Sequence, residues 1–196
     1  MRCVPRGWGL GWNGTLISCV LLGAIGISFC FERDPRTCLL TYQPRTTKPN
    51  CLGSPRSNYF ARDSVALPGL AAHFRKESNE ERAHAEQVME YQTERGGKVI
   101  LGPLAAPPSE FGEGNNKDAL NAAELALSME KLNLTKLLQL HVVADKAGDC
   151  QTCDYVEGDL LQPQRASVDE AARMVRTLHR IGDNGHGVWD FDRSLA

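Results

Sequence analysis

Acidic side chains are nearly missing from the first third of the chain. Residues 1–62 carry eight Arg or Lys but only two acids, Glu32 and Asp34, and residues 7–31 hold no charge at all. The rest of the 196-residue sequence carries 14 basic and 22 acidic side chains, a net charge of −8. Such an acidic body disfavours nucleic acid as a partner and favours cations. We therefore expect no nucleic-acid partner.

Regular alternation of apolar and polar residues is also missing, so no strand is expected in the body. Helical periodicity and Gly or Pro boundaries instead predict an all-α fold. A long connection after the first helix would let the first two helices run parallel, and Pro163 should bend or divide the third. The expected helices cover residues 63–95, 118–147 and 152–181, and a short last helix is expected in 188–195.

Cysteine is scarce in the body, where only Cys150 and Cys153 occur. The five thiols of residues 1–62 form no readable disulfide framework. The spacing of Cys150 and Cys153 matches a redox motif, but no βαβ pattern surrounds it. A loop thiol beside a helix start is the favoured interpretation.

Lys and Arg are absent from three apolar helical stripes that nevertheless contain polar side chains. Burying a carboxylate costs several kcal/mol unless it is paired. A cation held between the helices would offset the cost of burying the carboxylates in these stripes. The polar members are Glu81 and His84 (with Phe74, Val88 and Tyr91), Glu130 (with Leu120, Ala123, Leu127, Leu134 and Leu137) and Gln164 (with Leu161, Val168, Ala171, Val175 and Leu178).

Glu81 and His84 lie three residues apart and thus share one helical face. An isolated pair of this kind also fits a solvated helix surface. With Glu130 and Gln164 on two further stripes, the pattern favours a metal site like those of di-iron carboxylate bundles. Carboxylate oxygens with one imidazole suit Fe(II) or Mn(II) better than the sulfur-rich sites of structural zinc.

Residues 59–195 resemble ferritins, specifically those of plants and green algae. The matching stretches are YFARDSVALPGLAAHF, KESNEERAHAEQVMEYQTERGGKV, ALNAAELALSMEKLNLTKLLQLH, CDYVEGDLLQPQ and GHGVWDFD. The resemblance implies a four-helix bundle with a long crossover loop, assembled with other ferritin subunits into a shell of twenty-four. It also implies a di-iron centre that oxidises Fe(II) with O2 and passes Fe(III) to a mineral core.

The resemblance also implies roles for single residues. Glu81 would bridge the two irons, His84 would bind one of them and Glu130 the other. Gln164 would hold a nearby water or dioxygen species. Glu80, with Glu86, would start the mineral on the inner surface, where Ala83 replaces a commonly acidic residue.

Asp154 and Glu157 match the acidic threefold channel of the family, with Cys153 and His141 as neighbours. A ring of carboxylates would concentrate Fe(II) at such a pore. Both acids also fit an ordinary first helical turn, where the helix dipole favours negative charge.

The segment before Tyr59 departs from the family pattern, which has a helix there that supplies a Glu to the first iron. Thr46 stands near the position of that Glu, and residues 39–58 contain no acid. Pro44, Pro49 and Pro55 exclude a long helix. We expect only a last turn around residues 59–62, one iron site without its own carboxylate, and uncovered apolar stripes.

Residues 1–58 are therefore separated from a ferritin-like domain of residues 59–196. The basic, apolar head resembles a signal sequence or anchor, a transit peptide, or an irregular start, and residues 32–58 are interpreted as linker. A plastid is the expected location, with the cytosol, or membrane contact through residues 16–31, as alternatives. Rival functions are a non-catalytic shell or nucleating subunit, a truncated ferritin unable to assemble, and a membrane-anchored helical protein.

Overall fold

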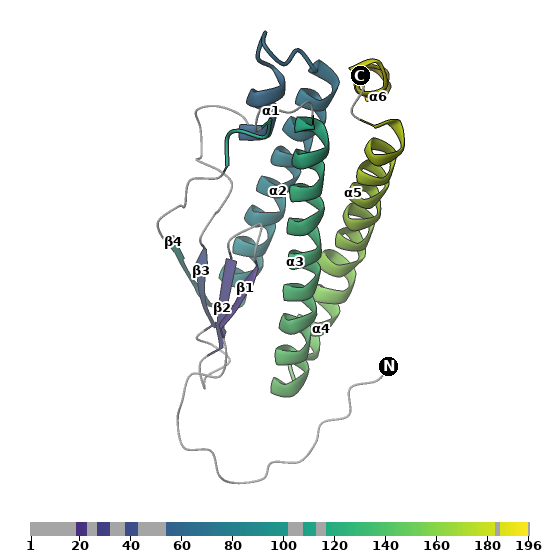
Figure 1. Cartoon of the computed structure of the whole chain (residues 1–196). Coiled ribbons are helices and arrows are strands. Elements are labelled where there is room, and N and C mark those ends of the chain that lie inside the picture. The colour runs from purple at the N-terminus through teal and green to yellow at the C-terminus, as the bar shows by residue number, and fades with distance from the viewer. Residues whose placement is uncertain are drawn as a thin grey trace.

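The computed structural model describes residues 19–22, 27–31, 38–42, 54–101, 108–112, 117–182 and 185–195. Three long helical rods lie side by side, with a short helix at one end and a small sheet beside the other (Figure 1). The predicted all-α class is confirmed for the bundle. The elements are β1 (Cys19–Leu22), β2 (Ile27–Phe31), β3 (Cys38–Tyr42), α1 (Pro55–Phe60), α2 (Pro68–Glu94), β4 (Lys98–Leu101), α3 (Asp118–Ala147), α4 (Cys150–Tyr155), the π-helix η1 (Val156–Leu161), α5 (Gln162–Ile181) and α6 (Gly185–Ser194).

The first long helix, α2, begins at Pro68 rather than at Asp63. Proline suits the first helical turn, because the N–H that it lacks would have no partner inside the helix. The preceding residues form turns, including Ala66 with a φ of 54°. The expected N-cap at Asp63 is therefore wrong, whereas the end near Gly96, with a φ of 76°, is confirmed.

Helix α3 begins at Asp118 as predicted, and Gly148, with a φ of 70°, closes it in the left-handed conformation. Helices α2 and α3 run parallel, which confirms the role expected of the long connection. One core cluster joins Leu70 of α2 to Ala119, near the starts of both helices. The other joins Val88 to Leu137, farther along both.

The third rod consists of α4, η1 and α5 in direct succession (Figure 1). Pro163 lies in the first turn of α5, immediately after the π-helix. Proline has no N–H for the helical ladder and clashes with the preceding turn. A wider π-turn relieves this conflict. The bend or division expected at Pro163 thus takes the form of a π-helix within one continuous rod.

A four-stranded sheet, in the order β1-β2-β3-β4, was not expected. Strands β1, β2 and β3 pair antiparallel, and β4 pairs parallel with β3. The linker interpretation is therefore wrong at residues 38–42, and the body contains a strand at residues 98–101. Four residues are too few to display an alternating pattern.

The apolar segment at residues 16–31 contributes β1 and β2 to this sheet. Strand β1 lies beside α3, and strands β3 and β4 lie beside α2. Among the residues that the structure describes, no helix is both long enough and apolar enough to cross a membrane.

The helical turn that precedes the bundle, α1, lies at Pro55–Phe60 rather than around residues 59–62. Pro55 occupies its first turn and so sets its start. The fully buried ring of Phe60 stacks on that of Phe74, with centroids 5.6 Å apart. This packing fixes α1 against α2 and brings the side chain of Arg56 to the interior of the bundle.

Candidate metal centre

The polar residues of the three stripes meet in the middle of the bundle. Glu81 and His84 of α2 and Glu130 of α3 line one cavity of about 40 Å³. Gln164 of α5 approaches from the third rod and bonds to Glu130. The structure therefore brings together all four residues that were predicted to form the centre.

Glu81 is the most perturbed acid of the cavity. Its Oε2 atom is buried and has no hydrogen-bond partner. Burial, followed by the negative charges of Glu130, Glu77 and Glu80, raises the pKa of Glu81 to about 8. An unpaired buried carboxylate oxygen is costly, and a bound cation would satisfy it.

Glu130 and Gln164 form a tight pair across two helices. The Gln164 amide donates to Glu130 Oε2 at 2.5 Å and to the Glu130 backbone oxygen at 3.2 Å. Burial raises the pKa of Glu130, and the bond from Gln164 opposes that rise. The amide thereby orients one carboxylate oxygen and leaves the other free to bind a ligand.

Arg56 is a cation that the sequence argument missed. That argument counted Lys and Arg only within the stripes, whereas Arg56 reaches the interior from α1. Its Nη2 atom lies 3.0 Å from Met129 Sδ, and its guanidinium stands 5.5 Å from the Phe74 ring centroid. Burial lowers the pKa of Arg56, and the charges of Glu77, Glu130 and Glu81 act against that lowering.

Further polar residues line the same cavity and were also missed, namely His73, Lys76, Glu77, Ser167 and Glu170. His73 Nε2 lies 3.0 Å from Glu77 Oε1. Burial alone would lower the pKa of His73, but the bond and the charge of Glu77 raise it above its ordinary value. His73 and Glu77 precede Glu81 at intervals of four residues, so the helical period could have revealed them.

The other predicted metal-binding residues, Glu80, Asp154 and Glu157, lie at the edge of the cavity or away from it. Glu80 lies at the cavity rim, 3.7 Å from Lys76 Nζ. Asp154 and Glu157 are exposed, and His141 Nε2 lies 2.7 Å from Glu157 Oε1. Within the described ranges, no three His, Cys, Asp or Glu side chains already form a complete metal cage.

The thiols expected beside the channel acids lie in α4. Cys153 is buried and Cys150 is partly exposed. The expected helix start is present, because α4 begins at Cys150, but both thiols lie within this helix rather than in a loop.

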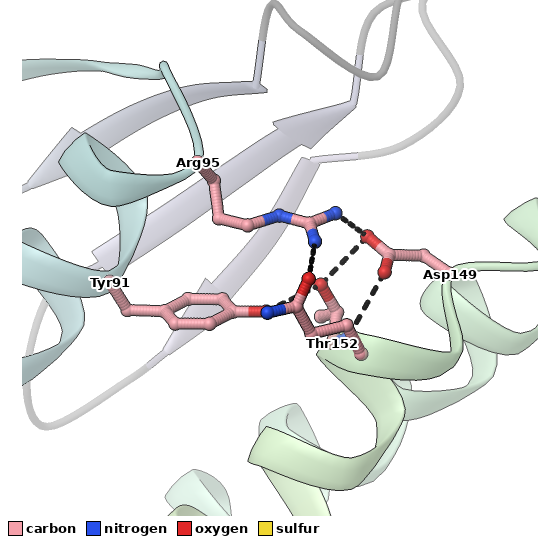
Figure 2. Close-up of polar contacts among 5 residues, drawn as sticks. Tyr91, Arg95, Asp149 and Thr152 are labelled. Carbon is pink, nitrogen blue, oxygen red and sulfur yellow. Dashed lines mark hydrogen bonds and ion pairs between the residues drawn. The ribbon is translucent and has the colours of Figure 1, made fainter.

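A polar network ties the end of α2 to the turn between α3 and α4 (Figure 2). Arg95 contacts Asp149 Oδ2 and Gln151 Oε1, each at 2.5 Å. Tyr91 Oη lies 3.0 Å from Thr152 Oγ1, and Asp149 also accepts the Thr152 backbone N–H at 3.1 Å. These bonds fix the end of α2 against the start of the third rod.

Parallel helices joined by a long crossover, with buried carboxylates, imidazole and an amide between them, define the class of ferritin-like domains. Residues 57–181 match the family model described as "Ferritin: Ferritin-like domain". The chain belongs to the ferritin family, as its resemblance suggested.

Similar proteins agree with this assignment. Ferritin-2, chloroplastic, of Vigna unguiculata is 53% identical over 137 residues, which are 70% of this chain and 54% of the relative. Ferritin-2, chloroplastic, of Zea mays is 47% identical over the same shares of both chains. The crystal structure of ferritin from the green alga Ulva pertusa has a TM-score of 0.69 at 51% identity, covering 72% of each chain.

The chain spans about half the length of these plant relatives. Their names place them in the chloroplast, in agreement with the plastid location expected from the sequence.

Proposed function

We propose that this protein stores iron in a plastid, by oxidising Fe(II) at the cavity of Glu81, His84 and Glu130 and depositing the ferric product within a shell of ferritin subunits. The observation that carries the proposal is the buried, unpartnered Oε2 of Glu81, which faces a second carboxylate. Iron is the substrate here.

In this proposal, Glu81 and Glu130 supply carboxylate oxygens and His84 supplies a nitrogen, a donor set that suits Fe(II). Gln164 holds the Glu130 carboxylate in place through its amide N–H groups and offers its carbonyl oxygen as an acceptor to a nearby water. Two Fe(II) ions each lose one electron, and O2 takes both electrons with two protons to give hydrogen peroxide. Displacing the Glu81 proton on binding would make uptake more favourable as the pH rises toward 8.

Iron entry and iron storage are assigned to acids other than the predicted ligands of the centre. Asp154 and Glu157 are exposed on the third rod, where a ring of copies in a twenty-four-subunit shell would attract Fe(II). Glu80, at the cavity rim, and the exposed Glu86 would pass Fe(III) to the growing mineral. Residues 1–58, set apart from the ferritin-like domain of residues 59–196, would carry a targeting signal in the part that precedes α1, because α1 itself packs against α2.

A second candidate function is a non-catalytic shell or nucleating subunit that assembles with complete ferritin chains. Two observations favour it. Residues 39–58 contain no acid to serve the first iron, and Arg56 places a positive charge near the carboxylates. A subunit of this kind would add mineral-binding surface without oxidising iron itself.

The deciding experiment is aerobic addition of Fe(II) to the purified full chain, followed by ferric absorbance. Oxidation by this chain should slow by about tenfold or more in Glu81→Ala and His84→Ala. Glu90→Ala, an exposed acid elsewhere on α2, is the matched control and should leave the rate unchanged. Equal rates in all variants would contradict the proposed centre. A slow chain that nevertheless raises iron loading when mixed with a complete ferritin would favour the second candidate.

A further inference from the structure

Arg56 of α1 lies beside the cavity and is none of the predicted ligands of the centre. Its guanidinium is held from two sides, by Met129 Sδ at 3.0 Å and by the face of Phe74 at 5.5 Å. Met129 precedes Glu130, and Phe74 lies two helical turns before Glu81. Contacts to both carboxylate-bearing helices therefore fix the charge beside the cavity.

The position of this charge differs from that of the other cation at the cavity. Lys76 is exposed and pairs with Glu80 at the rim. Arg56 is partly buried and interacts electrostatically with Glu77, Glu130 and Glu81. Arginine keeps its proton in proteins, so this positive charge is permanent.

Two divalent ions and one guanidinium would share the carboxylates of Glu77, Glu81 and Glu130, the three that interact with Arg56. These three supply at most three negative charges, of which Arg56 offsets one. Glu170 also lines the cavity, and Glu80 pairs with Lys76. Like charges that lie within several Å of one another repel strongly where water is largely excluded.

We propose that Arg56 is a built-in counter-cation that limits this centre to one tightly bound divalent metal ion, where the family resemblance implies two. The inference rests on the proposed function, because it concerns the same carboxylates. It assigns to Arg56 the control of metal stoichiometry and affinity. The second metal ion would bind only after the guanidinium moves away.

Calorimetric titration of the full chain with Co²⁺ under anaerobic conditions tests this inference. All proteins carry Asp154→Asn and Glu157→Gln, so that metal bound at the channel acids does not count. Arg56→Met keeps a flexible apolar side chain against Phe74 and removes the charge. Arg56→Lys keeps the charge, and Arg75→Met removes an equal charge from an exposed position of α2.

The expected result is one tight Co²⁺ per chain in the parent and in the Arg56→Lys and Arg75→Met variants. Arg56→Met should bind a second equivalent, or bind the first at least about tenfold more tightly. Circular dichroism checks the fold, and Arg56→Gln makes the same comparison if Arg56→Met loses helicity. Identical stoichiometry and affinity in the parent and in the folded neutral variant would overturn the role of Arg56.

Glu81→Ala in the same background distinguishes failure of the inference about Arg56 from failure of the proposed metal centre. If it weakens Co²⁺ binding while the Arg56 variants match the parent, the centre stands and only the role of Arg56 is wrong. If Glu81→Ala binds Co²⁺ as the parent does, the proposed centre itself is wrong, and the inference falls with it.

Discussion

The side-chain amide of Gln164 donates a 2.5 Å hydrogen bond to the carboxylate of Glu130, which lies on a different helix and 34 positions earlier. The same amide reaches the Glu130 backbone oxygen at 3.2 Å. Gln164 directly follows Pro163, and the π-helix before the proline gives the rod a wider turn there. The π-helix therefore lies directly before the segment that carries Gln164, whose amide orients the Glu130 carboxylate.

Gln164→Ala should weaken Co²⁺ binding to the full chain by about tenfold, because an outer partner that orients a ligand typically contributes this much. The bond from Gln164 lowers the pKa of Glu130, so its loss should raise that pKa further. Titration calorimetry at pH 7 measures the affinity. Gln162→Ala, an exposed glutamine two residues earlier, should bind Co²⁺ as the parent does. Equal affinities in both variants would contradict the orienting role.

Glu81→Gln should change the pH dependence of stability in the presence of EDTA. The pKa of Glu81 is about 8 in the folded protein against an ordinary 4.5. Between these values the folded state keeps a proton that the unfolded state releases, so stability falls as the pH rises and levels off above 8. The glutamine variant lacks this loss and should be more stable than the parent at pH 9, by on the order of a few kcal/mol.

Urea unfolding at pH 5 and pH 9 measures this difference. Glu86→Gln, an exposed acid on the same helix, should follow the parent at both values. The interpretation fails if Glu81→Gln loses as much stability between pH 5 and pH 9 as the parent loses.

Local signals in the sequence were sufficient to locate the long helices and to select four of the residues that lie at the centre. Gly148 closes α3 where the pattern ended, and the helical period placed Glu81 and His84 on one face. These features depend on neighbours within one or two turns. The spacing of a single stripe therefore predicted which side of each helix faces the centre.

Features that depend on distant segments could not be predicted in the same way. Arg56 enters the centre because Phe60 stacks on Phe74, a contact that no local pattern encodes. Strand β4 is four residues long and pairs with β3, which lies more than fifty positions earlier. The start of α2 was misplaced because Asp63 has the composition of a cap, whereas Pro68 sets the first helical turn.

Gly69→Ala should undock α6 from the start of α2. A Cβ atom at this position would lie 1.9 Å from the backbone oxygen of Asp192, and backbone cannot yield as a flexible side chain can. The neighbouring Leu70 N–H, which bonds to Asp192 Oδ1 at 2.7 Å, would lose its partner. We expect a loss of about 1–3 kcal/mol in the free energy of unfolding.

Thermal unfolding and amide exchange of residues 185–195 measure this effect. Gly158→Ala is the control, because nothing lies within 4 Å of a Cβ at that position. It should be neutral or slightly stabilising, since alanine favours helical structure over glycine by about 1 kcal/mol. Unchanged exchange of α6 in Gly69→Ala would contradict the close approach.

Asp149→Ala should loosen the junction shown in Figure 2. The substitution removes the ion-pair partner of Arg95, at 2.5 Å, and the acceptor for the Thr152 N–H at the start of α4, and it leaves Arg95 bonded to Gln151. Loss of a cap and of a partly buried ion pair together should cost about 1–3 kcal/mol. Urea unfolding measures this loss, and Asp145→Ala, which is exposed in the last turn of α3, should leave stability within about 0.5 kcal/mol of the parent.

The outer face of α3 offers a test of assembly. Leu132, Leu138 and Val142 are large apolar side chains that are 42%, 46% and 49% exposed. Leu138 and Val142 lie four residues apart and so form neighbours on one helical surface. In the proposed shell this surface is expected to contact another ferritin subunit, because apolar groups gain from leaving water.

The double variant Leu138→Gln, Val142→Gln should therefore retain its thermal stability as a single chain but assemble poorly. Both side chains are already solvated in the isolated subunit, so their replacement removes little buried apolar area. Mass photometry of refolded protein, with Thr135→Gln at an exposed site of the same helix as control, measures the fraction of chains in large assemblies. A fraction equal to that of the parent would mean that this face of α3 lies outside every subunit contact. A loss of thermal stability in the isolated chain would instead place the two residues in the subunit's own core.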